Sequence, residues 1–341
     1  MGLIILNYLS KLGIFKSVHQ ESVGSVNRMP VPNTSINETM LQASDILAKL
    51  RVQITYSHPD LLNRYPVVDY AHTLDSSDPL QGYGYAPPLT RKWCSEIEAL
   101  GGSSALENYH KLVLVYLMTD FDIRIKGLRV PNSILTLIAV SFQRILAQLE
   151  NAENKFYLHS NELFRKDLAL CRLKLLPCGS ELVDVYSGVP RSILFRGALQ
   201  QFVRCTRFFL HKGSGFRPWY ESHWDRRLIR SFTPQDYNQC YLRIAELLKL
   251  NPEIKGMMGS SWWFDPALES ISQNLTFLRK VPLDNGAQLF RVGTSAAANR
   301  AAIHLSAERR RLYDSGKYLP TIYMLAWDRK DMLEWANRYS S

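Results

Sequence analysis

Apolar residues recur at helical spacing over much of the first half of the chain. A capping-box pattern at Ser35–Glu38 precedes one such run, and residues 105–119 and 133–150 each carry enough apolar positions to face a core. Residues 57–92, in contrast, are rich in Pro, Gly, Tyr and Asp, a composition that indicates a long irregular surface segment. Residues 1–160 are therefore predicted to form a mainly helical N-terminal region that contains this irregular segment.

Short apolar runs and helical patterns alternate in residues 161–341. The predicted strands cover residues 168–176, 181–186, 216–223, 254–264, 276–281, 287–292 and 321–327. The predicted helices cover residues 192–211, 236–250, 295–315 and 330–339. A hairpin turn is expected at Asp284-Asn-Gly286. The alternation predicts an α/β (α+β) fold, in which a mixed sheet flanked by helices forms the catalytic region after the helical part.

The chain is basic, but its charge is not concentrated. Its 341 residues include 41 Lys and Arg against 31 Asp and Glu, a formal net charge of +10. Such an excess favours anionic partners: nucleic acid, acidic membranes, or phosphorylated small molecules such as coenzyme A. Because no run of five or more basic residues occurs, a small-molecule substrate is favoured over nucleic acid.

Neither the cysteines nor the apolar runs indicate a secreted or membrane-spanning protein. The five cysteines include no C-x-x-C pair, which disfavours both a disulfide scaffold and a structural zinc site. The apolar residues after Met1 lack a preceding basic segment, so an amphipathic helix is expected there rather than a signal peptide. Gln143 and Arg144 interrupt the run at 134–149, which is short of the ~18 apolar residues that a span needs. A cytoplasmic protein is expected.

Reactive side chains are densest just after residue 216. Glu221, His223 and Asp225 alternate, so on a strand all three would point to one face, where they could perform acid–base chemistry. Trp219 and Tyr220 could form the floor of a pocket beside them. The same residues also fit an edge strand with a solvated, charged face.

A metal hypothesis rests on the same segment. His223 and Asp225 form a His-x-Asp pair, and His304 downstream could complete a two-histidine, one-carboxylate site for Fe(II). Such a site would suit a non-haem oxygenase. His304 lies in a predicted helix, however, whereas a β-barrel oxygenase needs this histidine on a strand.

A second segment combines glycines, serines and tryptophans. Gly256 and Gly259 inside a strand pattern indicate a bulge or the close approach of a ligand. The side chains expected to face that ligand are Ser260, Ser261, Trp262, Trp263 and Asp265. A buried central strand packed against a neighbouring helix explains the same pattern.

The helix expected to begin near Ser295 is a third candidate. Its N-terminus follows Gly293 and would offer free N–H groups to a phosphate, with Arg291 and Arg300 close enough to assist. An ordinary N-cap explains these residues equally.

The order of elements from Leu168 onward resembles the GNAT superfamily of acyltransferases. In that family a strand leads into a helix whose N-terminus binds the coenzyme A pyrophosphate, and the next strand splays away to leave room for the acyl chain. Residues 216–223, 236–250 and 254–264 would be that strand, helix and strand. The segment Ser306–Tyr318 is similar to the family's late helix, which would make Tyr313 its tyrosine.

This resemblance covers about half the chain and implies acyl-coenzyme A as the cofactor. Residues 224–236 lack the family's glycine-rich pyrophosphate loop, and Arg226, Arg227 and Arg230 are assigned to supply positive charge there instead.

The leading hypothesis is an acyltransferase that moves an acyl group from a coenzyme A or carrier thioester to an amine. Glu221 or His223 would be the general base and Tyr313 the general acid. The predicted cofactor contacts are Arg226, Arg227, Arg230, Ser260 and Ser261, and the predicted substrate contacts are Trp219, Tyr220, Trp262, Trp263 and Asp265. The alternatives are the Fe(II) oxygenase and a non-catalytic binding protein for an anionic partner.

Overall fold

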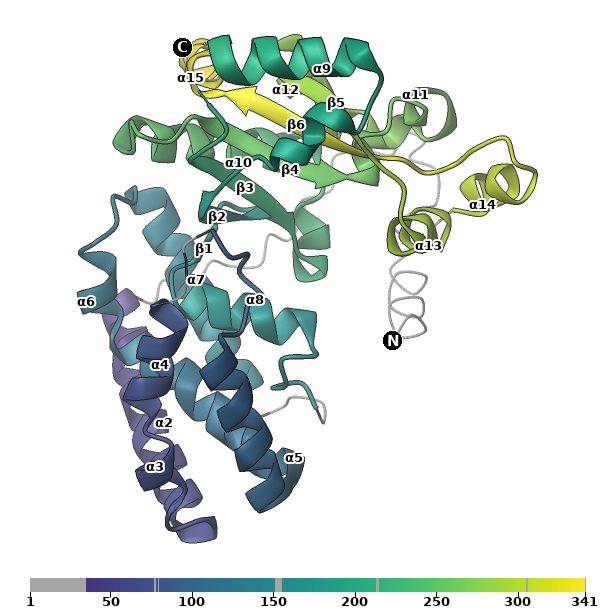
Figure 1. Cartoon of the computed structure of the whole chain (residues 1–341). Coiled ribbons are helices and arrows are strands. Elements are labelled where there is room, and N and C mark those ends of the chain that lie inside the picture. Colours follow the sequence, from purple (N-terminus) through teal and green to yellow (C-terminus); the bar gives the residue numbers. More distant parts are fainter. Residues whose placement is uncertain are drawn as a thin grey trace, which may run out of the picture.

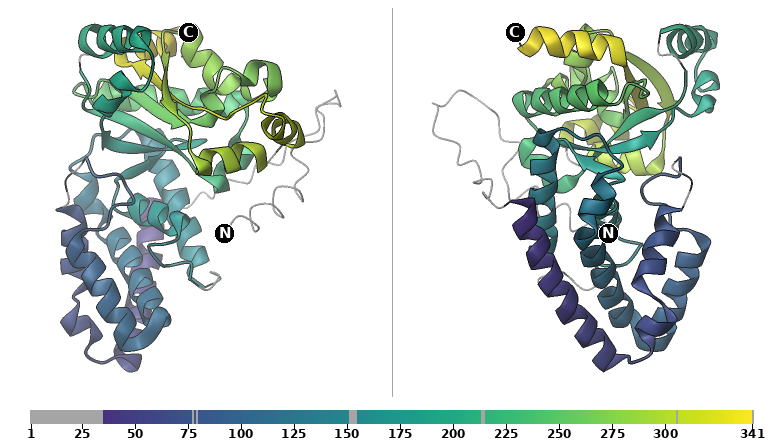
Figure 2. Two further views of the ribbon diagram at one scale, coloured as in Figure 1. Left: turned by 45° about the vertical axis from the view of Figure 1, so that its right-hand side comes forward. Right: turned by 90° about the vertical axis from the view of Figure 1, so that its left-hand side faces the viewer.

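The computed structural model describes residues 35–340, except 77, 79, 151–154, 213–214 and 305, and describes only the backbone at 229–231 and 340. The amphipathic helix predicted after Met1 lies outside these residues. Helices fill one end of the molecule, and one sheet flanked by helices fills the other (Figure 1). The further views in Figure 2 keep these two parts at opposite ends.

The helical part begins where local sequence signals place it. Helix α2 (Ile36–Ser57) starts at a complete capping box, in which Ser35 Oγ accepts from the Glu38 N–H and the Ser35 N–H donates to Glu38. The helices predicted at 105–119 and 133–150 are confirmed as parts of α5 and α7. The helices of this part after α2 are α3 (Leu61–Arg64), α4 (Val67–Asp75), α5 (Pro88–Thr119), α6 (Phe121–Ile125), α7 (Asn132–Gln148) and α8 (Glu162–Cys171).

The prediction of a long irregular segment at 57–92 is wrong for about half of its length. It contains α3, α4 and the first turn of α5, which together account for about half of its residues. Pro66 and Pro87 stand immediately before helices, where a missing N–H costs nothing, so these prolines begin helices rather than break them. Tyr70 and Leu74 then bury one face of α4.

A six-stranded sheet of order β1-β2-β3-β4-β6-β5 forms the second part. β3 and β4 are parallel and are joined through α10 (Pro234–Leu250), and every other neighbouring pair is antiparallel. The strands are β1 (Leu175–Pro177), β2 (Glu181–Ser187), β3 (Trp219–Trp224), β4 (Gly256–Ser261), β5 (Gln288–Gly293) and β6 (Ile322–Asp328). This arrangement confirms the predicted α/β fold class with a mixed sheet.

Two predicted strands contain helical residues. Residues 168–176 contain the end of α8 and only the start of the short β1, and residues 276–281 lie in α12 (Phe277–Asp284). A short apolar run cannot by itself distinguish a buried helix from a buried strand. The hairpin predicted at 284–286 is therefore a connection from a helix to a strand, with Gly286 at a φ of +93°.

Two long predicted helices are interrupted. The pattern at 295–315 forms α13 (Ala296–His304) and α14 (Ala307–Asp314), because Ser306 caps a new helix by accepting from the Arg309 N–H. The pattern at 192–211 forms η1 (Arg191–Phe195), α9 (Leu199–Thr206) and η2 (Arg207–Lys212). The remaining elements are η3 (Arg226–Ser231), η4 (Trp262–Phe264), α11 (Leu268–Ile271), η5 (Gln273–Leu275) and α15 (Arg329–Ser340).

Each face of the sheet is covered by different helices. α10 and α15 pack on the face that carries Met257 and Trp327, and their core is continuous with that of the helical part. Phe208 and Phe209 of η2 pack with Trp219 on the other face. No helix in the described part of the chain has the length and apolarity needed to cross a membrane.

Candidate functional site

A cavity opens where the two parallel strands part. Tyr220 of β3 pairs with Met257 of β4, and Glu221 pairs with Met258. No further residues of these two strands, which the structure describes in full, pair with each other. The cavity beyond this point has a volume of about 630 Å³. Its walls come from the ends of both strands, η4 and the helices α13 and α14.

The end of β4 shapes one wall of this cavity. Gly259 leaves room for the Ser222 hydroxyl where the strands begin to part, since a Cβ there would lie 2.4 Å from Ser222 Oγ. Ser261 Oγ accepts from the Trp263 N–H and thereby starts η4. Ser260, Ser261, Trp262 and Trp263 all line the cavity, so the structure brings together four of the residues that the sequence pattern singled out.

Glu181 is the titratable group of this site that sequence reasoning missed. It lies opposite Trp224 in the β2–β3 ladder, and strand alternation turns its carboxylate toward the cavity. Oε1 accepts from Tyr237 Oη at 3.5 Å, whereas Oε2 has no hydrogen-bond partner among the described residues. Burial raises the pKa of Glu181 to about 7.

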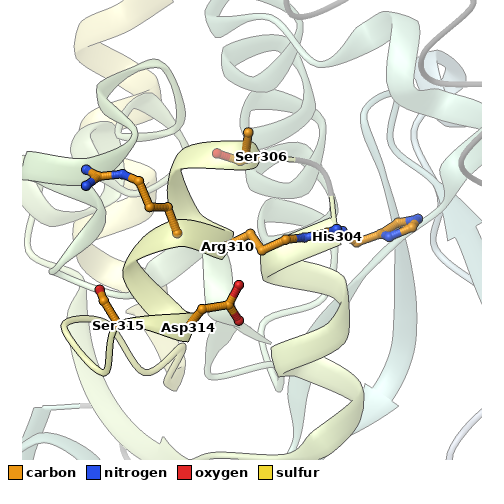
Figure 3. A pocket seen from close by; sticks show the side chains of 7 residues that line it. His304, Ser306, Arg310, Asp314 and Ser315 are labelled. Atoms are coloured by element: carbon orange, nitrogen blue, oxygen red, sulfur yellow. The ribbon is translucent and has the colours of Figure 1, made fainter.

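Positive charge lies at the rim of the cavity. Arg300 of α13 and Arg310 of α14 line it, together with His304. His304 and Arg310 also border an adjoining hollow of about 720 Å³, which Ser306 and Asp314 help to enclose (Figure 3). Arg300 of the helix predicted near Ser295 lines the cavity, whereas Arg291 and the residues at the start of that helix are not among the lining residues.

Glu221 and His223 lie on the other face of the sheet. Ser222 and Trp224 occupy the cavity face of β3, so the residues that alternate with them point away from it. Glu221 accepts from Ser187 Oγ at 2.7 Å. The His223 ring packs against Tyr83 at 4.8 Å between centroids, and burial lowers the pKa of His223 to about 4.

The three arginines predicted to bind the cofactor have different environments. Arg227 forms ion pairs with Asp225 at 2.6 Å and with Asp167 at 2.8 Å, so its charge ties α8 to the end of β3. Arg226 is exposed in η3, and the side chain of Arg230 lies outside the described part of the chain.

The predicted Fe(II) site is not assembled. His223 faces away from the cavity, Asp225 is paired with Arg227, and His304 comes from α13. Among the residues that the structure describes, the three potential metal ligands that come together are Cys94, His110 and His159.

The other predicted contacts are placed away from the cavity. Trp219 and Tyr220 are buried in the two cores on opposite faces of the sheet. Asp265 accepts from the backbone N–H groups of Thr321 and Ala267, each at 3.0 Å, and so holds a loop. Tyr313 is half-buried on α14 and is not among the lining residues.

Comparison with known proteins identifies the fold. No protein-family profile matches the chain. No curated protein matches it either. An acyltransferase solved in complex with decanoyl-CoA and teicoplanin superposes with a TM-score of 0.50 at 13% identity, covering 88% of this chain and 90% of that chain. An acyltransferase in complex with decanoyl-CoA gives 0.49 at 12% identity, covering 84% and 87%. The chain thus shares its fold with an acyltransferase of known structure.

Proposed function

We propose that this protein is an acyltransferase that moves an acyl group from a coenzyme A thioester to an amine. The observation that carries the proposal is the carboxylate of Glu181, buried and with one unpartnered oxygen, in the cavity between the parting parallel strands. A buried carboxylate with a raised pKa and one oxygen left without a hydrogen-bond partner is costly to a fold and is typical of a functional site.

The parting strands suit an amide-bearing thioester arm. Beyond Glu221 and Met258 the facing edges of β3 and β4 no longer pair with one another, so their backbone groups can bond to a ligand lying between them. The pantetheine arm of coenzyme A carries two peptide-like amides and matches such edges. Trp262 and Trp263 offer apolar surface to an acyl chain, and Arg300 and Arg310 offer charge to phosphates.

Glu181 has the protonation behaviour of a general base. At neutral pH about half of a carboxyl with a pKa near 7 is ionised and able to accept a proton. As the acceptor nitrogen forms its bond to the thioester carbonyl carbon, Glu181 takes the proton from that nitrogen. The carbon–sulfur bond then breaks, and the proton passes from Glu181 to the sulfur, which releases a thiol and an amide and restores the carboxylate.

The fold comparison suggests the class of donor to test. The structure with the shared fold holds decanoyl-CoA together with teicoplanin. We therefore propose a medium-chain acyl-CoA as the donor, with an acceptor that enters from the open side of the cavity.

The proposal is tested by incubating the purified protein with decanoyl-CoA and a panel of amines. Released thiol and acylated product are measured together, by a thiol reagent and by mass spectrometry. Wild-type protein and Glu221→Gln, which alters a carboxylate on the other face, are expected to turn over, and Glu181→Gln to lose at least ~100-fold in rate. Equal rates for Glu181→Gln and Glu221→Gln would remove Glu181 from the mechanism.

A further inference from the structure

A second polar cluster lies in the helical part of the molecule. Tyr70 comes from α4, and Cys94 and His110 come from α5 on either side of the kink at Gly102. His159 precedes α8. The hydroxyl of Tyr70 lies 3.3 Å from Cys94 Sγ, 3.2 Å from His110 Nε2 and 3.0 Å from His159 Nε2.

These four atoms outline a small tetrahedron. Cys94 Sγ lies 3.4 Å from His110 Nε2, and the three Cys and His donor atoms are all within 4.8 Å of one another. Four of the six distances among these atoms are 3.0–3.4 Å, and the two from His159 Nε2 to Cys94 Sγ and His110 Nε2 are at most 4.8 Å. A regular tetrahedron has its centre about 2.0 Å from each corner when its edges are about 3.3 Å and about 2.9 Å when they are about 4.8 Å, a range that includes the zinc–nitrogen and zinc–sulfur bond lengths of about 2.0–2.3 Å. One sulfur and two imidazoles are also the donor set that zinc prefers.

The backbone orients His110 so that the nitrogen a metal would bind faces the cluster. His110 Nδ1 lies 2.6 Å from the carbonyl oxygen of Tyr157, a contact that requires the proton on Nδ1 and leaves the Nε2 lone pair facing the cluster.

A Cys–His nucleophile explains the cluster less well. Such a dyad pairs a thiol with one imidazole where a substrate can reach them, whereas Tyr70 Oη lies against the thiol and both imidazoles and His110 is fully buried. The cluster also lies apart from the cavity between β3 and β4, since none of its residues lines that cavity.

We propose that Cys94, His110 and His159 bind one Zn²⁺ ion, with the oxygen of Tyr70 at the fourth position. A site closed by four protein atoms is structural rather than catalytic. It would fasten α4 and both halves of α5 to the segment that leads into α8. Binding converts the Cys94 thiol to a thiolate and releases its proton to solvent.

The surrounding charge partly opposes a bound cation. Arg165 and Arg172 lie near His159 and oppose a cation. Arg172 is itself paired with Asp75, at 3.2 Å between Nε and Oδ1, and the thiolate of Cys94 would offset one of the two metal charges. Without a metal, the same four atoms can hydrogen-bond to one another. The experiment therefore has to distinguish a site that binds a metal from one held by hydrogen bonds alone.

The test is a Co²⁺ titration of full-length protein that has been stripped with a chelator and shown by circular dichroism to remain folded. The expected result is one Co²⁺ per chain, with the strong visible absorption of a tetrahedral site, a sulfur-to-cobalt charge-transfer band, and displacement by one equivalent of Zn²⁺. Cys94→Ala is expected to lose the charge-transfer band and at least ~100-fold in affinity.

His72→Ala is the matched control, because it removes an exposed histidine from the same helix as Tyr70. This variant is expected to bind Co²⁺ as the wild type does. The proposal is overturned if the folded, stripped wild type takes up no stoichiometric Co²⁺ or Zn²⁺, or if Cys94→Ala retains the band. Neither readout depends on acyl transfer.

Discussion

The register of β2 against β3 determines that the carboxylate of Glu181 points into the cavity. Because Glu181 pairs with Trp224, its carboxylate shares a face with Ser222, whereas the more conspicuous Glu221 lies opposite Asp184 on the other face. A register slip of one residue would exchange the two faces and send a different carboxylate into the cavity.

A pH profile tests this residue directly. The base must be ionised to accept a proton, so kcat/KM for acyl transfer is expected to rise with pH and to level off above an apparent pKa near 7. Glu181→Gln is expected to lose this inflection together with its rate, and Glu221→Gln to keep it. An unchanged inflection in Glu181→Gln would assign the titration to another group.

The same group makes stability depend on pH. The pKa of Glu181 is raised from the ordinary glutamate value of 4.5 to about 7 in the fold, so ionisation destabilises the folded state. Stability is therefore fully present below pH ~4.5 and declines as pH rises to ~7, by about 3 kcal/mol. Urea denaturation of wild type and Glu181→Gln at pH 5 and pH 8 is expected to show the glutamine variant gaining relative stability at the higher pH. A pH-independent difference would contradict the raised pKa.

Gly256 at the start of β4 is a second single-residue requirement. Its φ is +155°, and a Cβ there would lie 2.3 Å from the carbonyl oxygen of Trp327 on β6. Gly256→Ala is expected to lower the free energy of unfolding by about 3 kcal/mol or more. Gly293→Ala is the control, since Gly293 also has a positive φ, +133°, but has open space around it. Its loss of stability is expected to be smaller, because it measures backbone strain without a steric clash. Equal losses of thermal stability would show that no clash occurs.

At the scale of elements, buried ion pairs join the helical part to the sheet. Asp167 of α8 and Asp225 after β3 are almost fully buried, and Arg227 bridges them. Arg144 of α7 adds a second pair to Asp167, at 2.7 Å. Arg227 therefore holds the end of β3, and with it one wall of the cavity, against the helices.

Arg227→Ala is expected to cost about 3–5 kcal/mol in urea denaturation, because it leaves the buried Asp225 without its ion pair. Hydrogen bonds from Arg227 help to keep the pKa of Asp225 below its ordinary value against the effect of burial. This stabilisation is present above pH ~3.8 and is lost as pH falls through the lower folded pKa. Arg129→Ala removes an exposed pair with Glu253 and is expected to cost less than about 1 kcal/mol. Similar costs for both variants would show that the Arg227 bridge is not structural.

At the scale of the whole molecule, the net charge of +10 supports both an anionic small ligand and a polyanion. The cavity distinguishes them, because it offers a confined volume with two arginines at its rim. A nucleotide-bearing thioester should therefore use both the apolar wall and Arg300 and Arg310, whereas a polyanion should bind by charge alone.

Thermal unfolding with decanoyl-CoA tests this distinction. Ligand at 100 times its Kd is expected to add about 2.7 kcal/mol of stability. The double variant Arg300→Ala/Arg310→Ala should bind decanoyl-CoA more weakly and decanoyl-pantetheine, which lacks the nucleotide, unchanged. If only a polyanion such as heparin binds, with a steep salt dependence, the protein is a non-catalytic binding protein and the acyltransferase proposal fails.

The sequence by itself determined those features whose physics is local. Capping at Ser35 and Thr233 and the stop at Asn251 involve hydrogen bonds within a few residues, so α2 and α10 begin or end where their residues indicate. The alternation at 181–186 likewise determines a strand. The glycines, serines and tryptophans near the end of β4 indicated the close approach of a ligand and a buried wall. The serines and tryptophans after Gly259 do line the cavity.

Only the tertiary structure decided which face each strand turns to the cavity and which distant residues meet. Strand register depends on partners far along the chain, so it placed Glu181 in the site and removed Glu221 and His223. Cys94 and His159 come together solely because α5 and the segment before α8 pack side by side. Burial, which alters the protonation of Glu181 and His110, is a property of the assembled core and has no counterpart in local sequence.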